Sequence, residues 1–388
     1  MNTDSTNLVD APSAPSATEW MTRAGVPFDR TRLAQEITRA RVDAGITKRR
    51  ADILFRAVGN DNNPRWHVAA DVVAAFARFG ITLPDTDGDT LRAVDHPLAR
   101  EIVAHRSAQY RARVLEDVQR RLRDDGRVYP RWIEDGAITG RMQCAEPNLQ
   151  GFPRDLRHVI AAPAGRVLVA ADYAQIELVV AAVVSQDVPM LDAVRAGRDL
   201  HRETAAALFE KPADAVTDSE RQLGKVVNFA PLYGMGAAGL ARKAGSAGIT
   251  IDEAQAKVYL NRFFAAHTAL AAWIRSMAAK GDHVETLTGR RIPIRPDDHN
   301  GKRANYVIQG TAAAGFMNAL ALLFERRRKY PDAHPVIAAH DAFVIEAPAA
   351  AADGVAREIE RAMIEGMKPV LGDVRARVET KVASVWTS

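Results

Sequence analysis

The chain has 388 residues, 47% of them hydrophobic, which is enough to bury a large core and to divide into several subdomains. Its single cysteine, Cys144, excludes an internal disulfide and a cysteine-rich zinc site, and it suits a reducing cytoplasm. The formal net charge of +4 is compatible with binding a polyanion but too small to indicate one, and no apolar run reaches the roughly 18 residues of a membrane helix.

The amino-terminal part of the chain is expected to be a disordered tail followed by helices. Residues 1–18 are rich in Ser, Ala, Pro, Thr and Asn and nearly lack large apolar groups, so we expect the fold to begin near Glu19. Helical patterns then dominate to about Asp125. One expected helix, between Pro97 and Gly126, carries Arg106, Arg111, Arg113, Arg120, Arg121 and Arg123. Such a cluster suits the binding of phosphates of a nucleic-acid duplex, although a solvated helix face has the same composition.

Strands are expected near residues 127–133 and 166–172. The apolar run from Val167 to Ala171 is typical of a buried strand, and Asp172 falls where that strand ends. An aspartate in this position is more often a turn former than a ligand, so it does not indicate a site without further evidence.

Mostly helical patterns fill the interval from Met190 to Lys280, and one expected helix has an ordered face. Four side chains recur at every fourth position, namely Arg221, Lys225, Phe229 and Tyr233. On a helix they form one stripe roughly 18 Å long. Guanidinium and ammonium groups bind phosphates and aromatic faces pack against bases, so this stripe suits a nucleoside triphosphate. A solvated basic face that runs into a core face has the same spacing.

The segment HPVIAAHDAFVIEAP predicts a hairpin over residues 336–347, and its tip carries Asp341. A carboxylate beside apolar strands must be paired, protonated or metal-bound to offset its desolvation. Aspartate, water and phosphate oxygens are the ligands that Mg²⁺ prefers. Together with the phosphate-binding stripe, Asp172 and Asp341 therefore predict a site for divalent metal ions.

These segments resemble the polymerase domain of family A DNA polymerases, the family of bacterial DNA polymerase I and many phage replicative enzymes. The resemblance covers roughly residues 20–388 through VPFDRTRL, TGRMQCAEPNLQGFPR, DYAQIEL, RDLHRETAAALF, RQLGKVVNFAPLYGMG, VETLTGRR, ANYVIQGTAAA and HDAFVIE. It implies an α+β right-hand fold with an antiparallel palm sheet. The implied divisions are a disordered tail (1–18), an N-terminal helical region with the thumb (19–125), palm (126–189), fingers (190–285, with a nucleotide-binding helix at 221–236) and palm again (286–388).

The resemblance implies a DNA-templated DNA polymerase that adds deoxynucleotides to a primer 3′-hydroxyl. Asp172 and Asp341, with the backbone carbonyl of Tyr173, are expected to hold two Mg²⁺ ions, for which Mn²⁺ can substitute. One ion would lower the pKa of the primer hydroxyl, and the other would take up charge on the departing pyrophosphate. Lys225 is similar to the family residue that steadies the α-phosphate and protonates the leaving group, so it is the third expected catalytic residue.

Further site residues follow from matching positions in the motifs. Nucleotide contacts are implied for Arg221, Lys225, Phe229, Tyr233, His201, Glu177 and Gln175. Glu177 resembles the steric gate that fills the space of a ribose 2′-hydroxyl, which implies a preference for deoxynucleotides. DNA contacts are implied for Arg141, Asn305, Gln309 and His340. The first three would touch the minor groove, where every base pair presents acceptors in nearly the same places.

The sequence departs from the family pattern at several positions. Val179 replaces an arginine after the IEL of the first aspartate motif, and Ala342 replaces the glutamate of HDE. Gly301 replaces a further arginine, for which Arg303 could substitute by a local shift. Two aspartates can suffice for two-metal chemistry, so we expect activity to survive. Pro231, within the stripe helix, is expected to kink it.

Two other functions stay open at this point. A single-subunit RNA polymerase or primase would share the aspartates and the stripe, although Glu177 argues against it. A degenerate polymerase kept as a DNA-binding or scaffold protein is suggested by Val179, Ala342 and Gly301. Thumb-like helices use nearly all residues before the palm, so no 3′-5′ exonuclease and no proofreading are expected. The expected partners are primer-template DNA and deoxynucleotides, with no membrane, for a monomer in the cytoplasm of a bacterial or phage-infected cell.

Overall fold

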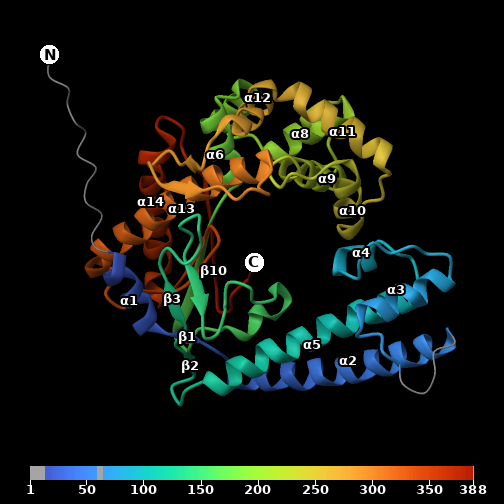
Figure 1. Ribbon diagram of the computed structural model, residues 1–388. Coiled ribbons are helices and arrows are strands. Elements are labelled where there is room, and N and C mark those ends of the chain that lie inside the picture. Colours follow the sequence, from blue (N-terminus) through green and yellow to red (C-terminus); the bar gives the residue numbers. More distant parts are fainter. Residues whose placement is uncertain (1–13, 59–63, 388) are drawn as a thin grey trace. The chain divides into compact units, whose positions relative to one another are not determined.

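The computed structural model describes residues 14–58 and 64–387 (Figure 1). These residues divide into two compact units. Unit 1 contains the stretch that ends at Arg30, the stretch from Arg121 to Gly197 and the stretch that begins at Ala272. Unit 2 contains Thr31–Arg120 and Arg198–Ala271. Each unit is therefore built from segments that are distant in the sequence. The finer division into palm, thumb and fingers stays a prediction.

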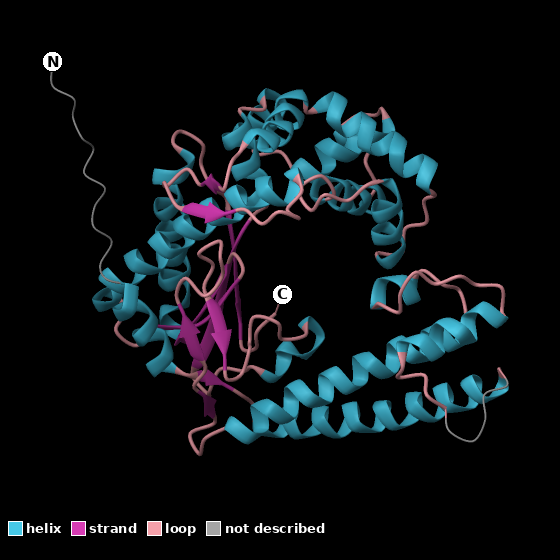
Figure 2. Ribbon diagram, viewed as in Figure 1, coloured by secondary structure: helices cyan, strands magenta, loops and turns pink. Residues whose placement is uncertain are grey.

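Unit 1 holds the strands that the structure describes (Figure 2). They are β1 Val26–Pro27, β2 Arg127–Val128, β3 Arg131–Ile133, β4 Gln143–Ala145, β5 Arg166–Tyr173, β6 His283–Glu285, β7 Arg291–Pro293, β8 His334–Ala339, β9 Ala342–Pro348 and β10 Val378–Ala383. Its α-helices are α1 Ala14–Ala24, α6 Ile176–Ser185, α7 Val188–Arg195, α13 Asn300–Glu325 and α14 Ala352–Leu371. The fold class is mixed α+β, and the strands predicted near 127–133, 166–172 and 336–347 are confirmed.

A four-stranded antiparallel sheet in the order β10-β5-β9-β8 lies at the centre of unit 1. Alternate side chains of a strand point to opposite faces of a sheet. The side chain of Tyr173, at the end of β5, points to α14, where its hydroxyl donates to the carbonyl oxygen of Met363 at 2.6 Å. Asp172, the preceding residue, therefore points to the face away from α14.

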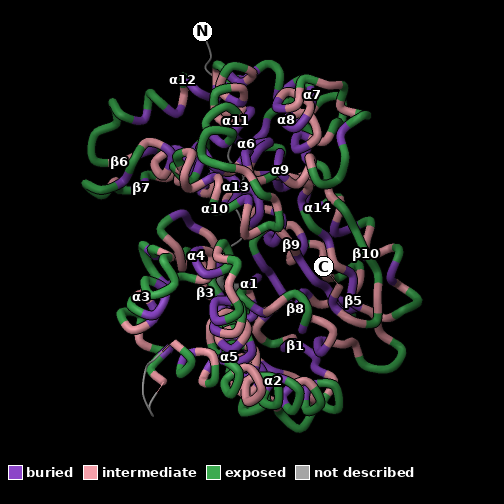
Figure 3. Tube along the Cα trace, turned by 90° about the vertical axis from the view of Figure 1, so that its right-hand side faces the viewer, coloured by how far each residue is buried: buried purple, intermediate pink, exposed green. Residues whose placement is uncertain are grey.

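The predicted hairpin is formed by β8 and β9, which are buried over most of their length (Figure 3). Their runs of Val, Ile and Ala fit strands that are covered on both faces. One charge, Glu346 of β9, lies within this core with its side chain only 2% exposed. Arg127 donates to its two carboxylate oxygens at 2.7 and 2.8 Å, and Arg166 also donates to it. These arginines offset the desolvation of the carboxylate.

Helix α13 crosses the interior of unit 1 and packs against α14 and α6. By length and composition α13 is also apolar enough to cross a membrane, although it contains no uninterrupted apolar run of about 18 residues. However, 67% of its most apolar stretch is buried inside the protein. Small residues allow this burial, because a Cβ at Gly315 would overlap the sulfur of Met367 in α14. Helix α13 is therefore a core helix of unit 1.

Unit 2 is helical in the residues that the structure describes. Its helices are α2 Arg30–Ala57, which begins at the last residue of unit 1, α3 Ala69–Arg78, α4 Gly88–Arg92, α5 Pro97–Arg121, α8 Leu200–Phe209, α9 Asp218–Phe229, α10 Ala237–Ser246 and α11 Glu253–Ala266. Helix α12, Thr268–Ser276, continues from unit 2 into unit 1. Phe55, Phe76, Leu98 and Ile102 belong to one buried apolar cluster of α2, α3 and α5. The predicted arginine-bearing helix is α5, but it ends at Arg121, so Arg123 lies outside it.

Two predicted boundaries are wrong. The sequence predicts a fold that begins near Glu19, whereas α1 starts at Ala14, and residues 1–13 of the predicted tail lie outside the described residues. The sequence also predicts a kinked helix over 221–236. Instead, α9 ends at Phe229 and residues 230–234 form turns. Pro231 has no N–H to donate to the preceding turn, so the helix stops before it.

Candidate active site

Asp172 and Asp341 meet at one end of the central sheet. Asp172 is the penultimate residue of β5, and Asp341 directly precedes β9. The backbone N–H of Tyr173 donates to the carbonyl oxygen of Asp341 at 3.2 Å, and the two aspartate side chains hydrogen-bond to each other. The structure thus brings together the pair that the sequence predicts. The backbone of Tyr173 adjoins this pair, while its carbonyl as a ligand stays a prediction.

The pKa values of these two carboxyl groups are shifted by burial and, for Asp172, by the charge of Asp341. Desolvation by the surrounding protein raises the pKa of Asp172, and the negative charge of Asp341 raises it further. Desolvation also raises the pKa of Asp341. Two carboxyl groups in contact cannot both ionise without a penalty, so the free pair favours a shared proton. A cation bound by both groups would remove that penalty.

The donor set fits a hard divalent cation. Among residues 14–58 and 64–387 no group of three or more His, Cys, Asp or Glu side chains could hold a metal ion. Mg²⁺ is often bound by only one or two carboxylates together with water and substrate phosphates. Asp172 and Asp341 therefore fit Mg²⁺ that is bound jointly with an anionic substrate, and they do not form a complete cage.

Arg141 and Glu177, which have separate predicted roles, form an ion pair. Glu177 lies in the first turn of α6 and its side chain is 14% exposed, and Arg141, 27% exposed, donates to its Oε1. The helix dipole favours a carboxylate in the first turn. Each group is thus held by the other, and either must leave this pair to contact a ligand directly.

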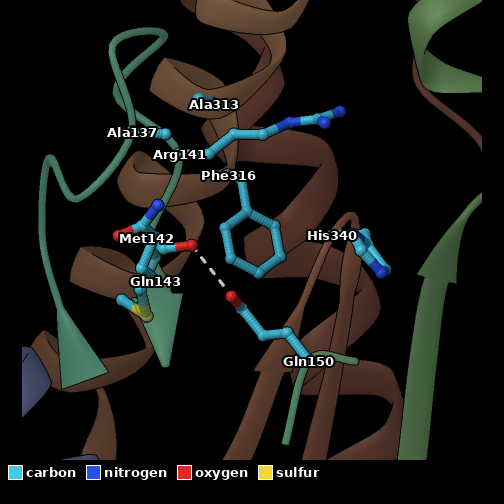
Figure 4. Close-up of a pocket in the computed structure, with 8 residues that line it drawn as sticks. All are labelled: Ala137, Arg141, Met142, Gln143, Gln150, Ala313, Phe316 and His340. Atoms are coloured by element: carbon cyan, nitrogen blue, oxygen red, sulfur yellow. Dashed lines mark hydrogen bonds between the residues drawn. The ribbon is translucent and has the colours of Figure 1, made fainter. Parts of the chain in front are cut away.

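Arg141 and His340 line one pocket of unit 1 (Figure 4). The other lining residues are Ala137, Met142, Gln143, Gln150, Ala313 and Phe316. The Gln150 side-chain amide donates to the carbonyl oxygens of Met142 at 2.9 Å and Ala338 at 3.0 Å. These bonds tie the segment that carries Arg141 to the hairpin that carries His340. The turn at His340 has a left-handed φ of 58°, which allows the chain to reverse before Asp341.

Asn305 and Gln309 lie one turn apart on α13. Asn305 is only 8% exposed, and its Oδ1 has no hydrogen-bond partner in the described part of the chain. Buried polar atoms are normally paired, so this unpaired amide oxygen is an exception within α13. Gln309 is half-buried rather than a surface residue. Its neighbour Gly310 permits close packing, because a Cβ there would lie 2.6 Å from Cγ2 of Thr286.

The structure does not support Arg303 as a replacement for the arginine that Gly301 lacks. The Arg303 guanidinium donates to the carbonyl oxygens of Asp298 at 2.7 Å and Met277 at 3.2 Å. Arg303 therefore anchors the loop before α13. Val179, which stands where the family pattern has an arginine, is buried in α6. Gln175 precedes that helix with a left-handed φ of 56°.

In unit 2, α9 presents the cationic part of the predicted stripe. Thr217 and Glu220 form a capping box that fixes the start of this helix. The Nε of Arg221 donates to Oδ2 of Asp199 at 2.7 Å. Lys225, one turn further, is exposed, and its side chain makes no hydrogen bond or ion pair with the residues that the structure describes. Lys225 is thus a cation available to an anionic ligand.

The aromatic part of the stripe persists although α9 ends early. The backbone N–H of Tyr233 donates to the carbonyl oxygen of Phe229 at 3.0 Å, and the two rings are 6.2 Å apart in an edge arrangement. His201 of α8 is buried, with Nδ1 3.0 Å from the Nδ2 of Asn228. Desolvation, reinforced by Arg221 and Lys225, lowers the pKa of His201 to about 4. His201 is therefore neutral near pH 7 and adds no charge for phosphates.

Sequence reasoning missed three groups near these residues. Asp199, the N-cap of α8, holds Arg221, and an aspartate before a helix signals only the cap. Arg154 lies close enough to Asp172 to lower its pKa in part. Glu379 of β10 lies directly opposite Asp172 in the sheet. The latter two contacts depend on tertiary structure, which no local pattern reveals.

The chain is similar to known polymerases over most of its length. A family model, DNA polymerase family A, matches residues 74–388. DNA polymerase I of Aquifex aeolicus is 34% identical over 326 residues, which is 80% of this chain and 56% of that protein. Thermostable DNA polymerase I of Thermus aquaticus is 34% identical over 281 residues, 68% of this chain and 33% of that protein. The chain thus spans between a third and somewhat over half of these relatives.

One solved structure has the same fold. The POL domain of Pol1 from M. smegmatis, in complex with DNA primer-template and dNTP, has a TM-score of 0.82 against this chain. The match covers 96% of this chain and 69% of that chain, at 24% sequence identity. At this level of identity the likeness shows the fold alone.

Proposed function

Because the chain belongs to the family A DNA polymerases, we propose that it is a DNA-templated DNA polymerase that adds deoxynucleotides to a primer 3′-hydroxyl. The observation that carries this proposal is the meeting of Asp172 and Asp341 at one end of the central sheet. A carboxylate pair of this kind suits the two-metal mechanism of phosphoryl transfer. The full relatives are longer than this chain, so the proposal concerns the polymerase domain.

The residues of the chain would bind and orient the reactants. Divalent cations, when bound, supply Lewis acidity to the primer hydroxyl and to the pyrophosphate. Asp172 and Asp341, with the Tyr173 carbonyl, would hold them. Lys225 would place its uncommitted ammonium at the phosphates and donate a proton to the leaving pyrophosphate. Arg221, oriented by Asp199, would add positive charge.

The Arg141–Glu177 pair supports selection of the sugar. A ribose 2′-hydroxyl in the space of Glu177 would displace its carboxylate from Arg141. An unsatisfied polar group in a desolvated site costs about 1–3 kcal/mol, or roughly tenfold to a hundredfold in discrimination. We therefore expect deoxynucleotides to be preferred. Phe229 and Tyr233 would pack against the nascent base pair.

Four polar residues would contact the primer-template end. Arg141, Asn305 and Gln309 can donate to minor-groove acceptors without reading the sequence. His340 would contact DNA from the tip of the hairpin. In this proposal, segments 126–189 and 286–388 act as palm, 190–285 as fingers, and the helices within 19–125 include the thumb.

Primer extension tests the proposal. The chain should extend a primed template with deoxynucleotides in Mg²⁺, and Asp172→Asn or Asp341→Asn should abolish extension. Asp332→Asn, an exposed position just before the opposite end of the β8–β9 hairpin, serves as the matched control and should stay active. Primer-template binding without extension in Mg²⁺ or Mn²⁺ would favour a degenerate, DNA-binding polymerase instead. Equal use of ribonucleotides would favour an RNA polymerase or primase.

A further inference from the structure

A third carboxylate, Glu379, stands beside the Asp172–Asp341 pair. In the antiparallel pairing of β10 with β5, Glu379 lies directly opposite Asp172. On the other side of β5, Ala342 of β9 lies opposite the same residue. Directly opposed residues share a face of the sheet. Glu379, Asp172 and Ala342 thus form a row across three strands, on the face away from α14.

This arrangement places like charges opposite each other, and Arg154 offsets only part of their repulsion at Asp172. Opposed residues have Cβ atoms roughly 4.5–5.5 Å apart, and like charges placed this way destabilise a sheet. The charge of Glu379 acts on Asp172 in this structure. Glu379 is exposed, and its side chain forms no ion pair or hydrogen bond with residues 14–58 or 64–387. Even Lys381, two residues along the same face, does not pair with it. A divalent ion at Asp172 would turn this repulsion into attraction.

We propose that Glu379 positions the divalent cation at Asp172 through a coordinated water molecule. Contact through water fits because the carboxylates do not converge into a direct three-ligand group among the described residues. Glu379 would thereby supply, from β10, the negative charge that Ala342 does not supply from β9. This inference rests on the proposed function of the Asp172–Asp341 pair. It assigns Glu379 as a positioning residue that contacts neither substrate nor metal directly.

Binding of Mn²⁺ alone, measured by the loss of the free-ion signal in electron paramagnetic resonance, tests the proposal without catalysis. Removal of an outer-shell partner typically weakens metal affinity about 10-fold to 100-fold. For Glu379→Gln we expect the lower end, about 10-fold, because the residue is exposed. Glu325→Gln makes the same charge change at the exposed end of α13 and should leave the affinity unchanged. Equal weakening in both variants would show a general charge effect and overturn the proposal.

Moving the carboxylate across the sheet provides a rescue. Ala342→Glu introduces an acid on the other side of Asp172, on the same face. In the Glu379→Gln background it should restore most of the Mn²⁺ affinity. No recovery, although circular dichroism shows a folded double variant, would mean that Glu379 does not act as a carboxylate on this face, and this also would overturn the proposal.

The Mg²⁺ dependence of primer extension separates this inference from the proposed function. Glu379→Gln should raise the Mg²⁺ concentration for half-maximal extension about 10-fold and change the rate at saturating Mg²⁺ much less. If the wild-type chain extends primers and Asp172→Asn does not bind Mn²⁺, but Glu379→Gln binds it normally, only this inference fails. If the wild-type chain neither extends primers nor loses Mn²⁺ binding on Asp172→Asn, the proposed function fails with it.

Discussion

Gly224, one residue before Lys225, packs closely against α8, and this position leads to a specific prediction. Gly224 of α9 faces α8, and a Cβ there would overlap the carbonyl oxygen of His201. The same Cβ would lie 3.1 Å from the backbone nitrogen and 3.2 Å from Cβ of Ala205. The first obstacles are backbone atoms, so no rotamer change can relieve them. Gly224→Ala must therefore push α9 away from α8.

The size of the effect follows from two opposing contributions. Overpacking a well-packed site costs about 1–3 kcal/mol. Alanine is better than glycine inside a helix by about 1 kcal/mol. Because the overlap is with a rigid carbonyl, we place the overpacking cost at the upper end and expect a net loss of about 2 kcal/mol. Gly45→Ala is the matched control, since in α2 its nearest new neighbour, a terminal nitrogen of Arg49, is 4.0 Å away. That variant should gain up to about 1 kcal/mol.

Urea denaturation followed by circular dichroism measures both variants against the wild-type chain. Hydrogen exchange of α8 and α9 should speed up in Gly224→Ala and not in Gly45→Ala. If Lys225 binds the triphosphate, the displaced helix should also raise the KM for deoxynucleotides. Equal stability of the two alanine variants would refute the packing argument, whatever happens to KM.

The burial of three other groups leads to further predictions. Glu346→Gln should lower the free energy of unfolding by about 3 kcal/mol in urea denaturation, because it leaves Arg127 and Arg166 beside a neutral amide. Unchanged stability would contradict this. Desolvation acts to raise the pKa of Glu346, but the two arginines hold this pKa below its ordinary value of 4.5. The stabilisation that the ionised carboxylate contributes is therefore complete above pH 4.5. It is lost as the pH falls through the lowered pKa. The stability gap between wild type and variant should therefore narrow in acid. Burial raises the pKa of the Cys144 thiol to about 11, so a thiol reagent near neutral pH should label only unfolded protein, and fast labelling of the folded chain would disprove it. With the pKa of His201 lowered to about 4 by desolvation, its imidazole NMR shifts should stay constant around neutral pH, and a titration there would count against the buried position.

Local patterns in the sequence predicted the parts of the fold that local chemistry determines. The run from Val167 to Ala171 forms β5, and the apolar arms around Asp341 form β8 and β9. Both aspartates mark strand ends, because an acid is a poor residue for a buried strand interior. The stripe spacing predicted a helix from residue 221, whereas α9 starts at Asp218 and ends at Phe229, because Pro231 acts as a stop rather than a kink.

The pairings within the site could not be predicted in this way. Arg141 and Glu177 form an ion pair between a loop and a helix, and Glu379 opposes Asp172 through the register of β10 with β5. Register between strands that are distant in sequence is decided by the whole sheet and its packing. The same holds for Arg303, whose engagement with Met277 removes it from the role that its sequence position suggests.

The ion pair between Arg141 and Glu177 also links two functions that the sequence treats as separate. If Arg141 moves to the minor-groove edge of a primer end, Glu177 loses its partner while the carboxylate stays largely buried. The carboxylate then gains more from a new hydrogen-bond donor than it would in the free protein. Because such coupling is reciprocal, a group that occupies Glu177 must in turn favour the release of Arg141 toward DNA. If Arg141 and Glu177 have the roles proposed above, contact with the primer end and selection of the sugar are not independent, and a substitution of Arg141 should change both.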